Sequence, residues 1–182
     1  GKGVSAVEAG SYDTAIAAFD QALEGSGKRI GNFEEDVLFN RAEAEYKQGD
    51  YEAALATYQL LLKSDSDNEM AKQGAALCLA EAGEWEQALA FGVLQSRIYS
   101  RMAASQIEAG QYEEALQTIA LGRSLPDQSA ARNLDFNEAV IREKQGDFAQ
   151  ALQLFEAYEK KYGPEEAVER EIVFLKSRQG GQ

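Results

Sequence analysis

The chain contains no histidine, and this absence restricts the chemistry that it can perform. Without imidazole there are no Ser-His or Cys-His nucleophile pairs, no usual zinc ligand sets and no common proton shuttle. Three carboxylate pairs lie near predicted helix starts: Glu34–Glu35, Glu113–Glu114 and Glu165–Glu166. Negative side chains there interact favourably with the positive end of the helix dipole, which explains these pairs without catalysis. We therefore expect a protein that is not an enzyme and that uses no cofactor or metal ion.

Cysteine, proline and long apolar runs are also scarce. The single cysteine, Cys78, cannot form an internal disulfide, and its small neighbours predict a buried thiol. The two prolines, Pro126 and Pro164, are expected between helices, where a missing N–H costs nothing. No apolar run approaches the roughly 18 residues of a membrane span, so we expect no direct membrane insertion.

The start of the chain leaves the compartment open. No charged-then-apolar leader is present, yet the first expected helix begins abruptly at about Gly3, as if the N-terminus had been trimmed. We expect a soluble protein that is cytoplasmic or, if a leader or lipid anchor preceded Gly1, extracytoplasmic.

Basic residues are outnumbered by acidic ones. The chain has 18 Lys and Arg against 31 Asp and Glu, which gives a formal net charge of −13 at pH 7. Nucleic-acid binding needs a basic stripe that releases counterions, and the basic residues here are dispersed. Nucleic acids and anionic membranes are therefore not expected as partners. Basic or apolar peptides remain compatible, although the simplest interpretation is that Asp and Glu solvate the outer helix faces.

One pattern recurs through the chain: glycine, any residue, an aromatic, any two residues, alanine, then isoleucine or leucine. The five copies begin at Gly10, Gly49, Gly83, Gly110 and Gly146. A unit repeated at this scale can bury its apolar face only against its neighbours. The recurrence therefore predicts a repeat architecture.

Each copy joins two predicted helices. Residues 35–48 have helical spacing without proline or glycine, and Gly49 supplies the positive φ that ends a helix cheaply. Apolar residues then follow Tyr51 at i+3, i+4, i+7, i+10 and i+11, as one stripe of a second helix. The repeat is an antiparallel helical hairpin, and the fold class is all-α.

These residues resemble the tetratricopeptide repeat (TPR) family. The best-matching copy fits its pattern with Ala42, Gly49, Tyr51, Ala54, Tyr58 and Leu61. The resemblance implies a right-handed superhelix, an α-solenoid of stacked hairpins, whose first helices line a concave groove for an extended peptide or a partner helix. The lysine and asparagine clamp with which some members hold a C-terminal carboxylate is absent.

The expected domain is a single array over residues 1–182. Its repeats are placed at about 1–24, 34–64, 68–95, 96–124 and 130–162, with a capping helix at about 164–178. The glycine intervals are 39, 34, 27 and 36, against about 34 for the family. The 39-residue interval predicts an exposed insertion around Gly25–Gly31. The short one has two explanations, a shortened second helix in the third repeat or residues missing after about Phe91, and we favour the second.

The resemblance also assigns groove positions. They are Asp36, Phe39, Glu43, Tyr46 and Lys47 in the second repeat, Met70, Gln73, Leu77, Ala80 and Glu81 in the third, Arg97, Ser100, Ala104, Ile107 and Glu108 in the fourth, and Asn133, Phe136, Val140, Glu143 and Lys144 in the fifth. The apolar members suit a hydrophobic or amphipathic segment. We expect a protein–protein interaction scaffold; the alternatives are a structural or self-assembling module, possible as a homo-oligomer, and the sensor domain of a larger protein.

Overall fold

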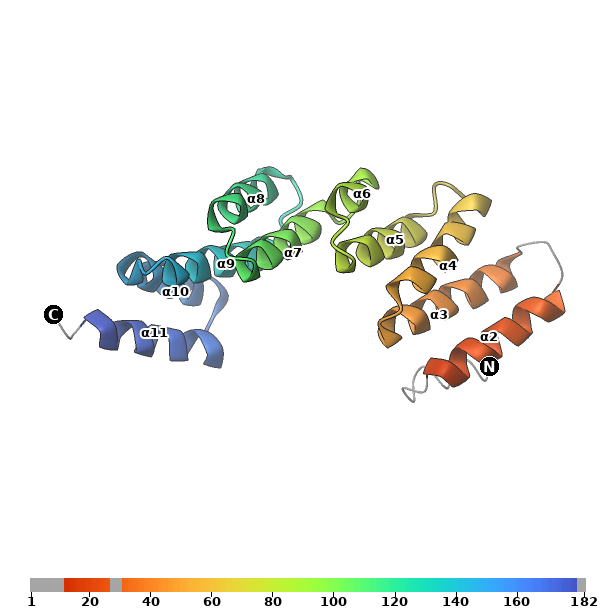
Figure 1. The fold of residues 1–182 in the computed structure, drawn as a ribbon, viewed down its shortest axis with the longest axis horizontal. Helices are drawn as coiled ribbons and strands as arrows, with labels where there is room; N and C mark the ends of the chain where they lie inside the picture. Colours follow the sequence, from red (N-terminus) through yellow and green to blue (C-terminus); the bar gives the residue numbers. More distant parts are fainter. Residues whose placement is uncertain (1–11, 27–30, 180–182) are drawn as a thin grey trace. The chain divides into compact units, whose positions relative to one another are not determined.

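The computed structural model describes residues 12–26 and 31–179, and within these residues the fold is helical with no strand. The chain forms two compact units, which we call the N-terminal unit (residues 1–94) and the C-terminal unit (residues 95–182). The helices of the N-terminal unit are α2 (Tyr12–Ser26), α3 (Asn32–Gln48), α4 (Tyr51–Ser64), α5 (Glu69–Glu81) and α6 (Trp85–Ala90); those of the C-terminal unit are α7 (Gln95–Glu108), α8 (Tyr112–Ser124), α9 (Ala131–Lys144), α10 (Phe148–Tyr162) and α11 (Glu166–Gln179) (Figure 1). The predicted all-α fold is confirmed.

The repeated glycines end helices with the same backbone turn. Gly49 has φ of 87°, its N–H donates to the Tyr46 carbonyl at 3.0 Å, and the Asp50 N–H donates to the Glu45 carbonyl at 3.0 Å. These two bonds satisfy carbonyls that the helix end would otherwise leave unpaired. The same pair of bonds and a positive φ recur at Gly83, Gly110 and Gly146. The predicted role of the glycines is confirmed at these four turns.

In the N-terminal unit the helices pack in chain order, α2 on α3, α3 on α4 and α4 on α5. The motif alanines Ala15 and Ala54 are buried, because a side chain larger than methyl would hold neighbouring helices apart. The Cys78 thiol is buried in α5, as the sequence predicts, and burial raises its pKa to about 12. Residues 1–11, which include the helix predicted at Gly3–Ala9, and residues 27–30 of the predicted insertion lie outside the described residues.

The second helix of the third repeat is short. Helix α6 has six residues, and Gly92 and Leu94 then take positive φ of 72° and 50° before α7 begins at Gln95. The chain as it stands therefore folds with a shortened helix, which is the first of the two explanations of the 27-residue interval. The favoured alternative, that residues are missing after Phe91, stays a prediction.

In the C-terminal unit α7 packs on α8, α9 on α10 and α10 on α11. The largest cluster joins Phe155 and Tyr158 of α10 to Val168, Ile172 and Leu175 of α11. Helix α11 thus occupies the place of the predicted capping helix. Both prolines fall between helices, as predicted.

Candidate peptide-binding groove

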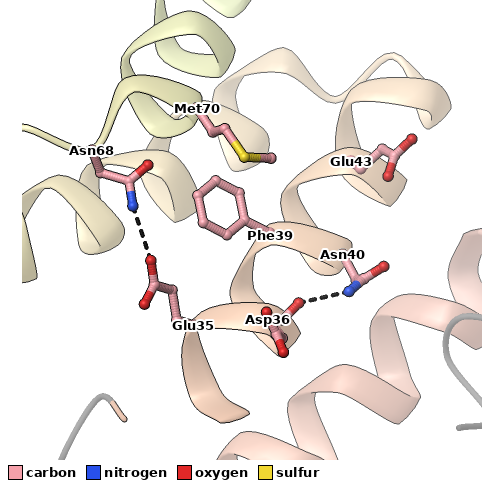
Figure 2. A pocket seen from close by; sticks show the side chains of 7 residues that line it. All are labelled: Glu35, Asp36, Phe39, Asn40, Glu43, Asn68 and Met70. Carbon is pink, nitrogen blue, oxygen red and sulfur yellow. Dashed lines mark hydrogen bonds between the residues drawn. The ribbon is translucent and has the colours of Figure 1, made fainter. Parts of the chain in front are cut away.

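A cavity of about 620 Å³ opens between two first helices of the N-terminal unit, α3 and the start of α5. It is lined by Glu35, Asp36, Phe39, Asn40, Glu43, Asn68 and Met70 (Figure 2). Four of these residues, Asp36, Phe39, Glu43 and Met70, are groove positions that the family resemblance assigns. The cavity is the candidate functional site.

The apolar part of the site consists of Phe39 and Met70. The Phe39 ring stands in the middle of the cavity with the Met70 thioether beside it (Figure 2). Phe39 is half-buried and rests on the Tyr58 ring of α4, with 6.4 Å between ring centroids, whereas 66% of Met70 is exposed. A rigid ring beside a flexible, exposed thioether gives apolar surface that can adapt to a ligand.

Packing behind the site fixes the position of Tyr58. The Tyr58 ring lies on Gly74 of α5, where a Cβ atom would come within 2.2 Å of Tyr58 Cζ. This burial raises the pKa of Tyr58 to about 12. Gly74 therefore lets α4 and α5 approach closely. The Tyr58 ring is held between these helices and supports the Phe39 ring.

Two asparagines organise the polar rim. Asn68 Oδ1 accepts from the Ala71 N–H at 3.0 Å and so caps α5, while Asn68 Nδ2 donates to Glu35 Oε1 at 2.9 Å. Asn40 Nδ2 donates to the Asp36 carbonyl at 2.7 Å. One amide therefore links α3 to α5, and the other follows the backbone of α3.

The upper part of the α3 face carries charge. Lys47 Nζ lies 2.6 Å from Glu43 Oε1, and this hydrogen bond raises the pKa of Lys47. The Tyr46 hydroxyl donates to Glu81 Oε1 of α5 at 2.8 Å, which gives a second link between the first helices. Gln73 and Leu77 are half-buried on α5 and do not line the cavity.

The groove residues predicted for the fourth and fifth repeats lie on helices α7 and α9 of the C-terminal unit. Arg97 on α7 and Lys144 on α9 are exposed, whereas Phe136 and Val140 are half-buried on α9. The Phe136 ring packs edge-on against Phe155 and Tyr158, with centroids 5.7 and 5.8 Å apart.

Ile107 has little surface to offer a ligand. Only 6% of the residue is exposed, because its side chain packs into a cluster with Ala103, Ile119 and Leu134. Helical spacing identifies the apolar side of a helix, but it does not tell which of its residues are buried in the core and which are exposed to a ligand.

A second, smaller cavity of about 190 Å³ lies in the C-terminal unit and is lined by residues of α8, α9 and α10. Its charged groups already pair with one another: Asp135 accepts from Arg123 at 2.7 Å and from Lys161 and Tyr162 at 2.8 Å each. Burial would raise the pKa of Asp135, but these hydrogen bonds together lower it. The cavity is therefore a weaker candidate than the one beside Phe39.

Three lining residues, Glu35, Asn40 and Asn68, are absent from the sequence-based groove assignment. The available signals were the cap position of Asn68 and the one-turn spacing of Asp36 and Asn40. Among the residues that the structure describes, no cluster of His, Cys, Asp and Glu is arranged to hold a metal ion. Within the same ranges, no helix is long and apolar enough to cross a membrane.

Comparisons with known proteins agree with this architecture. The hairpins and their glycine turns define a helical-repeat protein. Sequence models described as tetratricopeptide repeat match residues 1–69 and 39–92, just over half of the chain together, and residues 135–163. The chain belongs to the tetratricopeptide repeat family. A search of curated proteins found no match.

Solved structures show the same fold at low sequence identity. A tetratricopeptide repeat protein from Parabacteroides merdae ATCC 43184 matches with a TM-score of 0.62 at 16% identity, over 98% of this chain and 71% of that one. MamA of AMB-1 gives 0.55 at 19%, over 90% and 97%. YrrB, a TPR protein with an unusual peptide-binding site, gives 0.54 at 20%, over 92% and 87%. Such a fold is typical of a protein–protein interaction scaffold.

Proposed function

We propose that this chain is a non-catalytic scaffold that binds an extended peptide or a partner helix on the face formed by α3 and α5. The observation that carries the proposal is the cavity around Phe39 and Met70. Burying a side chain of this size contributes about 1.5–3 kcal/mol, so a ligand that covers Met70 and the open face of Phe39 gains affinity from both. The peptide-binding site of the structural neighbour YrrB supports this role.

The test is a selection of displayed random peptides against the whole chain, followed by affinity measurements on variants. Phe39→Ala removes the ring, and Met70→Ala removes an exposed side chain with little effect on folding. We expect about a tenfold or greater loss of affinity for Phe39→Ala, because an aromatic anchor carries on the order of 2 kcal/mol, and a smaller loss for Met70→Ala.

Leu60→Ala is the matched control. Leu60 is 41% exposed on α4 and does not line the cavity. This variant should bind the selected peptides as the parent does, and circular dichroism should show native helix content in all three variants. Peptides that bind Phe39→Ala and Met70→Ala as tightly as the parent would place binding elsewhere.

A second candidate, self-association, is supported by the outer face of α11. Val173 and Phe174 are 69% and 40% exposed and adjacent. An apolar pair of this kind can seat a second copy of the chain. Sedimentation across micromolar concentrations tests this: association that Val173→Glu abolishes would support it, and a concentration-independent monomer would reject it.

A further inference from the structure

We infer that the cavity between α3 and α5 selects a cationic side chain, Lys or Arg, next to an apolar residue of the bound segment. This inference rests on the proposed function, since it names the chemistry of the ligand at the same cavity.

The cavity lining has one sign of charge. Glu35, Asp36 and Glu43 contribute three carboxylates, and none of the described residues that line the cavity is Lys or Arg. Lys47 pairs with Glu43 but is not part of the lining. A ligand that enters therefore meets a negative potential that is only partly compensated.

Hydrogen-bond acceptors are in excess within the cavity. Both asparagine amides already donate, Asn68 to Glu35 and Asn40 to the Asp36 carbonyl. Among the described residues no side chain pairs with the Asp36 carboxylate, and only one oxygen each of Glu35 and Glu43 has a partner. The cavity thus offers charged acceptors to a donor-rich ligand group, and ammonium and guanidinium carry only donors.

The apolar floor fits the rest of such a side chain. Lys and Arg have aliphatic stems that pack on apolar surface while the charged end stays at a polar rim. In Figure 2 the Phe39 ring and the Met70 thioether of α5 lie side by side, with Glu35 and Asp36 on one side of the ring and Glu43 farther along α3. A guanidinium can also stack on an aromatic face. An apolar neighbour in the ligand would cover the exposed part of Met70.

The charge of the whole N-terminal unit favours the same class of ligand. Residues 1–94 contain 17 Asp and Glu against 7 Lys and Arg, a formal charge of −10. A field of this sign raises the association rate of cationic segments and lowers that of anionic ones.

The experiment uses three synthetic peptide pools that are identical except at one position. Each has a fixed Leu beside an Arg, a Gln or a Glu, with randomised neutral flanks and a fluorescent label. Binding to the whole chain is measured by anisotropy at low salt and at about 0.5 M salt. We expect the Arg pool to bind best, the Glu pool worst, and the Arg advantage to shrink with salt.

Neutralising variants locate the effect. In the double variant Asp36→Asn with Glu43→Gln we expect the Arg pool to bind about threefold to tenfold more weakly, since each partly exposed pair contributes up to about fivefold. Glu52→Gln is the matched control, because Glu52 is exposed on α4 and does not line the cavity. Replacing Asp36 and Glu43 with Lys should shift the preference to the Glu pool.

The outcomes separate this inference from the proposed function. Equal binding of the Arg and Gln pools, with both weakened by Met70→Ala, would overturn the cation preference and leave the groove assignment standing. The cation preference would also be overturned if the double variant Asp36→Asn with Glu43→Gln bound the Arg pool as tightly as Glu52→Gln does. If Phe39→Ala and Met70→Ala left the binding of every pool unchanged, both ideas would fall.

Discussion

The two units of this chain use charge differently. Residues 95–182 contain 14 Asp and Glu against 11 Lys and Arg, a formal charge of −3, whereas residues 1–94 carry −10. In the C-terminal unit the cations pair across helices, as when Arg123 of α8 contacts both Asp135 and Glu138 of α9. The N-terminal unit has fewer cations, and among its described residues Arg41 of α3 makes such a pair with Asp20 of α2 at 3.1 Å. Its surplus of carboxylates includes Glu35, Asp36 and Glu43, which line the cavity around Phe39.

The two units also differ in the size of their core side chains. Helix α5 buries Ala71, Gly74, Ala75, Ala76 and Ala80, so the N-terminal unit depends on close backbone approach. The C-terminal unit instead buries Phe155 and Tyr158 together with Leu and Ile side chains. One backbone plan thus accommodates two packing solutions: small residues draw helices together, and large ones fill the space between them.

The largest effect is expected for Phe155→Ala. The Phe155 side chain is fully buried, and its removal should destabilise the C-terminal unit by about 3–5 kcal/mol. Urea unfolding measures this loss of stability. Hydrogen exchange in the variant, compared with the parent, should accelerate more in α9, α10 and α11 than in α3 and α4. Leu121→Ala, an exposed position on α8, serves as the control and should change little. Equal acceleration in both units would mean that they unfold as one.

Glu45→Ala tests the polar part of the other core. Glu45 is 2% exposed, and it accepts from Arg41 Nε at 2.8 Å and from the Thr57 hydroxyl at 2.7 Å. Its loss leaves the buried hydroxyl without this acceptor and should cost about 2–3 kcal/mol. The decrease in the urea midpoint should be accompanied by faster exchange in α3 and α4. A loss no larger than that of exposed Glu52→Ala would show that the network contributes nothing to stability.

Gly74→Ala tests the close approach in the N-terminal unit. The added methyl forces the Tyr58 ring to move, at a cost of about 1–3 kcal/mol. Cys78 in the same helix is a convenient reporter, because a buried thiol with a pKa near 12 is unreactive until α5 opens. Alkylation of Cys78 should therefore be faster in Gly74→Ala than in the parent. An unchanged rate would mean that the ring shifts at no cost.

The smallest of these effects concerns pH and the C-terminal unit. Asp135 has a lowered pKa, so the stability that its ion pairs contribute is present above the unfolded value of about 3.9 and is lost as the pH falls through the folded pKa. Asp135→Asn should cost about 1 kcal/mol at pH 7 and should flatten the fall of the urea midpoint below about pH 4. A parallel pH curve for parent and variant would contradict this.

Local rules and the repeat pattern were sufficient to predict the helical hairpins and the helix ends at Gly49, Gly83, Gly110 and Gly146. Gly49 and its equivalents and the buried Cys78 depend on neighbours close in sequence or on a recurring position. The six-residue length of α6 was one of two explanations that the sequence left open, although Gly92 directly after Phe91 takes the positive φ that ends a helix.

The site was predictable only in part. Phe39 and Met70 follow from the family pattern, but the bond between Asn68 and Glu35 joins residues 33 positions apart and depends on how α3 and α5 align. The depth of Ile107 likewise depends on the helices that surround it. Spacing in the sequence tells on which side of a helix a side chain lies. How deeply that side chain is buried, and which residues of other helices it contacts, requires the packed structure.

The turns at Gly49, Gly83, Gly110 and Gly146 are closed by main-chain atoms alone. Because no side chain takes part in those bonds, the chain reversal itself depends on the backbone conformation of one glycine and not on the side chains beside it. Solved structures that share only 16–20% of their residues with this chain have the same fold.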